Sequence, residues 1–299
     1  MKVNLYRTKK AQQWIAASYD RLLDEWGVAT QLKDIETRYG STRVIVCGNP
    51  EAPPLLLLHG VGDDSALMWI YNAAALAPHF RLYAVDTLGG PGKSVPNRNY
   101  NQTFDHSVWM DEVLDGLGLA EVNLAGVSHG GYLVQYYTLV RPERVKKAVA
   151  LAASVPVRSA GHTMLTMMRI FLPQALLPTS KNVHKLLTKL TGDNSAAFTG
   201  NPLIVEHFLH LLKGYNNMAM KYHDIASFSE AQISSIRDKV LYLAGNADPF
   251  MIRGGKAALE AARMNVRFFD GVGHGINHEI AAAINAIFIE HFTGSKVRV

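Results

Sequence analysis

The stretch that decides the fold is Gly126-Val127-Ser128-His129-Gly130-Gly131, which lies between an apolar run and a helical pattern. The run at 122–128 is typical of a buried strand, and the pattern at 131–141 is typical of a helix that ends before a proline. A serine raised on a tight strand-to-helix turn requires glycine two residues before it and two residues after it. The pattern favours a nucleophilic Ser128 over a glycine-rich turn without chemistry.

Strands and helices alternate along most of the chain. Alternating strands and helices predict an α/β fold with a doubly wound, mostly parallel sheet. Apolar runs predict further strands at 42–48, 54–60, 81–86, 145–153, 239–245 and 265–271. Apolar residues at helical spacing predict further helices at 11–26, about 65–76, 108–119, near 254–263 and at 277–292.

The alternation is interrupted once. Residues 155–227 carry scattered prolines and glycines and several short helical patterns, without a convincing strand. We therefore expect an inserted helical cap at 155–227. The core would then consist of 1–154, with the N-terminal helix, the first strands and the serine turn, and of 228–299.

Two loops after the insertion supply the partners that a nucleophilic serine needs. Asp248 follows the strand at 239–245, and His274 follows the strand at 265–271 among small residues. A serine hydroxyl needs a base to take its proton, and the base needs an acid to orient it. Each residue alone could be a helix cap or a loop histidine. Their order along the chain, and their places at strand ends, predict a catalytic triad of Ser128, Asp248 and His274.

An oxyanion hole needs two hydrogen-bond donors. One expected donor is the backbone N–H of His129, which follows the serine. The loop after the strand at 54–60 should provide the other, from the backbone N–H of Val61 or, as the alternate, of Gly62. His59 is expected to pack and form hydrogen bonds beneath the site.

The cap is expected to form a wall of the substrate pocket. The predicted pocket residues are Met164, Met168, Phe171 and Phe208. Methionines usually fill gaps in a core, but clustered over an active site they can also form an adaptable apolar pocket.

No metal site is predicted. His207 and His210 are three residues apart on an expected cap helix, with His223 nearby, but no carboxylate-rich ligand set accompanies them. We expect these histidines at the surface. The string LGGPGKS at 88–94 is similar to a phosphate-binding loop, but Thr87 stands where that loop needs its first glycine.

The composition narrows the class of protein. The chain has 299 residues, of which 48% are hydrophobic and 18% are charged, so it can bury a core and is not disordered. No apolar run approaches the ~18–20 residues that span a bilayer. The single cysteine, Cys47, and the lack of an apolar segment after the basic start suggest a cytoplasmic protein. The net charge of +5 comes without basic runs interleaved with aromatics, so no nucleic acid partner is expected.

These residues together resemble a known superfamily. His59-Gly60, Gly126-x-Ser128-x-Gly130, Asp248 and His274 are similar to the motifs of the α/β hydrolases, over nearly the whole chain after the first helix. Within that superfamily, the strings APPLLLLHG, YAVDTLGGPGKS and RPERVKKAV resemble the NP-type carboxylesterases of bacilli. Some of those relatives carry glutamate where this chain has Asp248. The resemblance implies the α/β-hydrolase fold, hydrolysis of small-molecule esters and no cofactor.

Two classes of function follow from this reasoning. The first is a serine hydrolase that cleaves carboxylic esters through an acyl-enzyme. The same residues could also serve carbon–carbon bond hydrolysis, lactone opening or acyl transfer, because one fold hosts many chemistries. The second is a small-molecule receptor or signalling protein that retains the triad. The natural substrate and the oligomeric state stay open at this point.

Overall fold

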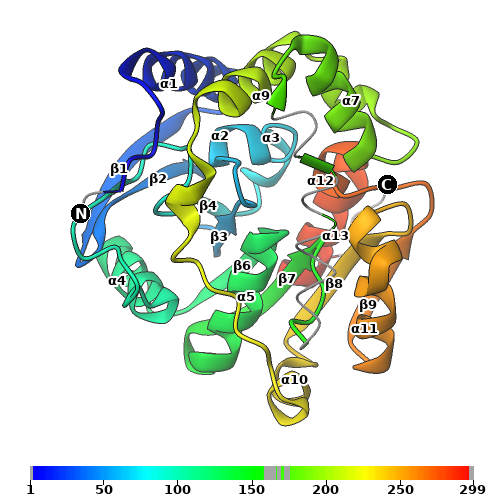
Figure 1. The fold of residues 1–299 in the computed structure, drawn as a ribbon. Coiled ribbons are helices and arrows are strands. Elements are labelled where there is room, and N and C mark those ends of the chain that lie inside the picture. Colours follow the sequence, from blue (N-terminus) through cyan, green and yellow to red (C-terminus); the bar gives the residue numbers. More distant parts are fainter. Residues whose placement is uncertain (1–2, 158–165, 167–169, 172–175, 296–299) are drawn as a thin grey trace.

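A single sheet forms the centre of the molecule in this computed structural model, which describes residues 3–157, 166, 170, 171 and 176–295. Over these residues the sheet has nine strands: eight follow the order β1-β2-β4-β3-β6-β7-β8-β9, and β5 pairs with β2 outside this order (Figure 1). The strands are β1 (Thr30–Thr37), β2 (Gly40–Gly48), β3 (Pro54–Leu58), β4 (Arg81–Val85), β5 (Val95–Pro96), β6 (Val122–Val127), β7 (Val145–Leu151), β8 (Val240–Gly245) and β9 (Asn265–Phe269).

The strands from β4 to β9 in this order pair in parallel, whereas β2 is antiparallel to β1, β4 and β5. The predicted fold class, a doubly wound and mostly parallel sheet, is therefore confirmed. The carboxyl ends of the parallel strands lie at one edge of the sheet, so the loops that follow β3, β6, β8 and β9 can meet there.

Helices cover both faces of the sheet. Leu55 and Leu57 of β3 belong to a buried cluster that includes residues of α1, α2, α3 and α13, while Leu56 and Leu58 belong to a second cluster with residues of α4, α5, α10 and α11. Successive side chains of a strand point to opposite faces, so an apolar run such as 54–58 is suited to a strand covered on both sides. The helices are α1 (Lys9–Asp24), α2 (Ser65–Met68), α3 (Ala73–Leu76), α4 (His106–Leu117), α5 (His129–Val140), α7 (Ser180–Leu190), α8 (Ala196–Thr199), α9 (Pro202–Gly214), α10 (Glu230–Ile236), α11 (Lys256–Ala261), α12 (Ile276–Glu279) and α13 (Ala281–Thr293).

Several elements differ from the sequence predictions. The helix expected at about 65–76 is two short helices, α2 and α3, and the one expected near 254–263 is a π-helical turn (Met251–Gly255) followed by α11. The edge strand β1 was not predicted. Half of its residues are exposed, and polar residues dominate it.

The insertion between β7 and β8 is helical where the structure describes it. Within 155–157, 166, 170, 171 and 176–227, it contains helices and the 3₁₀ turn η2 (Asn217–Met220), with one isolated bridge between Tyr6 and Tyr215. Helices α7 and α9 lie together with α1 at the same end of the molecule (Figure 1). The exact cap boundaries stay a prediction. In the described part of the chain, no helix has both the length and the apolarity that crossing a bilayer requires.

Candidate active site

The turn between β6 and α5 holds Ser128 in a strained conformation. Its φ is 56° and its ψ is −114°, a region that non-glycine residues rarely adopt. Such a conformation costs on the order of 1–3 kcal/mol and persists only where the surroundings enforce it. Here the Ser128 N–H donates to the carbonyl of Leu151, at 2.9 Å, and the Tyr132 N–H donates to the carbonyl of Ser128, at 3.0 Å.

The glycines on both sides of the serine are required by close backbone contacts. A Cβ atom on Gly126 would lie 2.3 Å from the carbonyl oxygen of Gly130. A Cβ atom on Gly130 would lie 2.3 Å from the carbonyl oxygen of Leu58. These distances are far below van der Waals contact, so the turn can form only if both positions lack side chains. The spacing of the motif therefore has a steric cause in this chain.

Asp248 and His274 are hydrogen-bonded to one another. They follow β8 and β9, which pair in parallel, so the loops after these strands begin side by side. The Nδ1–H of His274 donates to Oδ2 of Asp248 at 2.8 Å. Asp248 is fully buried, and its Oδ1 accepts a hydrogen bond from the Phe250 N–H at 2.8 Å. The contact holds the His274 ring with Nε2 as the nitrogen that is free to accept a proton.

The pKa of His274 is raised above its ordinary value. Burial acts to lower this pKa, but the charge of Asp248, its hydrogen bond to the ring and the charge of Glu279 together outweigh the burial. An imidazole stabilised as the cation by a buried carboxylate is a stronger base, as proton transfer from a serine hydroxyl requires.

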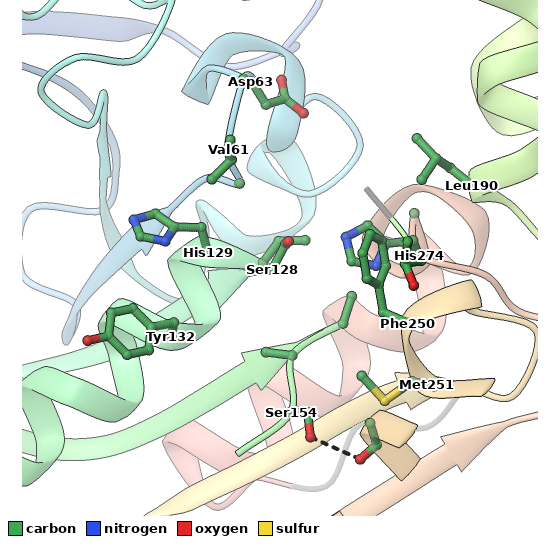
Figure 2. A pocket seen from close by; sticks show the side chains of 18 of the residues that line it. Val61, Asp63, Ser128, His129, Tyr132, Ser154, Leu190, Phe250, Met251 and His274 are labelled. Carbon is green, nitrogen blue, oxygen red and sulfur yellow. Dashed lines mark hydrogen bonds between the residues drawn. The ribbon is translucent and has the colours of Figure 1, made fainter. Parts of the chain in front are cut away.

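Ser128 and His274 line the same cavity, which has a volume of about 600 Å³ (Figure 2). Phe250 packs against the His274 ring, with ring centroids 4.7 Å apart. Of the predicted pocket residues, Phe171 and Phe208 line the cavity. Met164 and Met168 lie outside the described residues.

The loop after β3 borders the same cavity. Val61 and Gly62 both line the cavity, and Gly62 has a positive φ of 72°. His59 is buried beneath this loop: its Nδ1–H donates to the Gly60 carbonyl at 2.8 Å, and its Nε2 accepts from the Thr87 N–H at 2.9 Å. The predicted packing role of His59 is confirmed.

His129 is the first residue of α5, where backbone N–H groups have no acceptor inside the helix. Its side chain is turned away from the serine and lies within hydrogen-bond distance of His223, with 3.3 Å between His129 Nε2 and His223 Nδ1 (Figure 2). Burial, with the neighbouring imidazoles of His106 and His59, lowers the pKa of His129 to about 3. This side chain is therefore neutral and does not compete with His274 as a proton acceptor.

Glu279 ties the histidine loop to the helical insertion. Its Oε1 and Oε2 accept from the Gly273 N–H at 3.0 and 3.2 Å, and Oε2 also accepts from the Gly192 N–H at 2.7 Å. Burial raises the pKa of this carboxyl. Glu279 thus positions the residue before His274, a role that no local sequence pattern indicated.

The prediction that His207 and His223 lie at the surface is wrong. His207 is fully buried, and its Nε2–H donates to Oδ2 of the equally buried Asp64 at 2.7 Å. His223 is also buried, and its Nε2–H donates to the carbonyl of Leu88 at 2.6 Å. Each of these histidines finds its partner in a distant part of the chain, so the local helical pattern could not indicate that it is buried.

A family model described as the alpha/beta hydrolase fold matches residues 53–279. The chain belongs to this family. The match includes the serine turn and both loops that carry Asp248 and His274, and the parallel sheet and strand-to-helix turn are those of an α/β hydrolase.

This α/β hydrolase is similar to carboxylesterases of Bacillus subtilis (strain 168). It is 35% identical to the carboxylesterase YbfK over 179 residues, which are 60% of this chain and 54% of the relative. It is 34% identical to the uncharacterized carboxylesterase nap over 192 residues, which are 64% of this chain and 60% of the relative. The aligned residues thus span less than two thirds of either relative.

The similarity in structure extends further along the chain. The solved structure of naproxen esterase (carboxylesterase NP) from Bacillus subtilis has a TM-score of 0.79 at 26% identity, over 96% of this chain and 99% of that structure. The solved structure of carboxylesterase CesB (YbfK) has a TM-score of 0.78 at 25% identity, with the same coverage. The resemblance of the sequence to NP-type carboxylesterases is confirmed.

Proposed function

We propose that this α/β hydrolase is a serine carboxylesterase, which cleaves small-molecule esters through an acyl-enzyme. The observation that carries the proposal is the hydrogen bond between His274 and the buried Asp248, in the cavity that Ser128 also lines. The similarity to two carboxylesterases of Bacillus subtilis supports it.

The reaction begins at Ser128. Its Oγ attacks the ester carbonyl carbon while Nε2 of His274 takes the hydroxyl proton. Asp248 accepts the Nδ1–H hydrogen bond throughout and stabilises the imidazolium. When the tetrahedral intermediate collapses, the carbon–oxygen bond of the leaving alcohol breaks and His274 gives its proton to that oxygen. Water then attacks the acyl-enzyme by the same route, which releases the carboxylic acid and restores Ser128.

The oxyanion hole of the proposed mechanism consists of backbone donors. The N–H groups of His129 and Val61 would hold the developing negative charge, with Gly62 as the alternate to Val61. Loss of one such donor typically costs roughly 10²–10³ in rate. Every step uses groups of the chain and water, so the reaction as written requires no cofactor.

The cavity walls favour uncharged acyl groups. Aromatic and aliphatic side chains line much of the cavity, including Phe171, Phe198, Phe208 and Val155. Each methylene of the substrate that enters such a pocket gains up to ~0.8 kcal/mol until the pocket is full. We therefore propose short to medium uncharged acyl esters as the substrate class.

Covalent labelling and turnover test the proposal together. Wild-type protein should hydrolyse p-nitrophenyl esters and react with a fluorophosphonate probe. Ser128→Ala should lose labelling and roughly 10⁴-fold or more in turnover, because the attacking oxygen is gone. Ser154→Ala is the matched control for labelling: Ser154 lines the same cavity but donates its hydroxyl to the Gly255 carbonyl, so this variant should still be labelled.

Two results would overturn the proposal. One is a Ser128→Ala variant that retains more than about a tenth of the wild-type rate. The other is rapid labelling of wild-type protein without hydrolysis of any ester in a panel of increasing acyl length, since that is the behaviour of a receptor that retains the triad.

A further inference from the structure

Three buried histidines meet next to the serine turn, outside the proposed triad. His106 is the first residue of α4, His129 is the first residue of α5, and His223 follows η2. All three are buried. No step of the proposed ester hydrolysis uses these three side chains.

The distances between their ring nitrogens fit a single metal ion. His106 Nε2 lies 3.0 Å from His223 Nδ1, and His129 Nε2 lies 3.3 Å from the same atom. One nitrogen from each ring can be chosen so that all three lie within 4.8 Å of one another. Two nitrogens bound to a tetrahedral Zn²⁺ at ~2.0–2.1 Å are about 3.3 Å apart, so the two His223 distances already fit one ion and the third pair has to close from at most 4.8 Å.

Hydrogen bonding between the rings does not by itself account for this arrangement. The Nε2–H of His223 donates to the Leu88 carbonyl at 2.6 Å, so Nδ1 of this ring carries a lone pair and no proton. That one lone pair faces a nitrogen of His106 and a nitrogen of His129, although it can accept only one strong hydrogen bond. An outer N–H held by a backbone carbonyl is the usual way in which a protein orients a histidine ligand of a metal.

We infer that His106, His129 and His223 form a binding site for a divalent transition-metal ion that favours imidazole, with Zn²⁺ as its representative. His129 and His223 line the 600 Å³ cavity, so an ion has a path from the cavity to the three rings. Asp224, next to His223, also lines the cavity and adds negative charge along that path. Coordination requires His106 and His129 to carry their ring proton on Nδ1, so that Nε2 of each ring is free to bind the ion. Only bonds between the ion and the ring nitrogens form, and no covalent bond of the protein breaks.

Metal binding by tag-free, chelator-treated protein tests this inference. Equilibrium dialysis of wild-type protein should find about one Zn²⁺ per chain, and Co²⁺ in its place should show the intense visible absorption of a tetrahedral site. His223→Gln and His106→Gln should each weaken Zn²⁺ binding by more than about 100-fold, because each removes a ligand. His184→Gln, on the exposed side of α7, is the matched control and should bind Zn²⁺ as the wild type does.

The readout is independent of the proposed esterase. Ser128→Ala should bind Zn²⁺ with unchanged affinity, so a failed esterase proposal and a failed metal site give different results. The inference is refuted if wild-type protein binds no Zn²⁺, or if Co²⁺ shows only the weak spectrum of an octahedral site. These two results need no variant. Zn²⁺ binding that persists in both His223→Gln and His106→Gln would also refute it.

Discussion

His207→Ala should destabilise the protein far more than the loss of an ion pair at the surface. His207 of α9 lies between two residues of other elements: its Nε2–H donates to Asp64 at 2.7 Å, and its Nδ1 lies 2.8 Å from Oγ of Ser18 on α1. All three residues are fully buried. Asp64 also caps α2, through a hydrogen bond from the Leu67 N–H at 3.1 Å.

The expected magnitude follows from the state in which Asp64 would be left. Burial acts to raise the pKa of Asp64, but the charge and hydrogen bond of His207, with the Leu67 N–H and the charge of His59, together hold this pKa below its ordinary value. Without His207, the Asp64 carboxylate would stay buried. Among the hydrogen bonds that the structure records for this carboxylate, the one from the Leu67 backbone N–H would remain. Leaving a buried carboxylate without the partner that holds it costs roughly 3–5 kcal/mol.

The matched control joins the same two helices at the surface. Arg21 of α1 and Glu206 of α9 form an ion pair at 2.6 Å, with side chains 51% and 41% exposed. Arg21→Ala should cost about 0–1 kcal/mol, because solvent screens an exposed pair. At ~2 °C per kcal/mol for a chain of this size, His207→Ala should lower Tm by about 6–10 °C and Arg21→Ala by at most ~2 °C.

The pH dependence separates the loss of the Asp64 partner from a simple cavity. A carboxyl with a lowered pKa in the folded state contributes stability above its unfolded pKa of ~3.9, and this contribution is lost as pH falls through the folded pKa. The difference in unfolding free energy between wild type and His207→Ala, measured by urea titration, should therefore persist from pH 7 to about 5 and shrink as pH falls below about 4. A loss below 1 kcal/mol at pH 7, or one that does not change with pH, would refute the reasoning.

Two further predictions concern the histidine loop. His274 must be neutral to accept a proton, and its pKa is raised, so kcat/KM for an ester should rise with pH through an apparent pKa above ~6.5. Asp248→Asn should lower that apparent pKa and reduce the rate by up to roughly 10⁴-fold. An unchanged pH profile in this variant would exclude Asp248 as the partner of His274. Glu279→Gln should reduce kcat several-fold with little change in KM, because the amide replaces a carboxylate that holds the Gly273 N–H. The control Glu290→Gln, on the exposed side of α13, should leave both constants as in the wild type. Equal kinetics in the two variants would contradict the positioning role of Glu279.

The core of the fold could be predicted from local patterns in the sequence. A strand buried on both faces must be apolar at every position, as 54–58 is, and the serine turn must have glycine at 126 and 130 for steric reasons. The meeting of Asp248 and His274 was also predictable. Parallel strands that follow one another place their loops at the same edge of the sheet, and the structure places the two side chains 2.8 Å apart.

The edge strand β1 is a different case. Thr30–Thr37 is rich in polar residues, so it lacks the apolar periodicity by which a strand is found in a sequence. It is a strand because its backbone pairs with β2 along its whole length. That pairing is a property of the tertiary structure.

The sequence by itself determined most of the sheet, the serine turn and the loops at its edge, because each depends on residues that are neighbours along the chain or on the rules of parallel strand order. Only the tertiary structure decided what His207 and His223 do. His207 meets Asp64 across 143 residues, and His223 meets His106 across 117 and His129 across 94. An imidazole is stable in a protein interior only when its nitrogens find partners there, and those partners come from segments that the fold alone brings together.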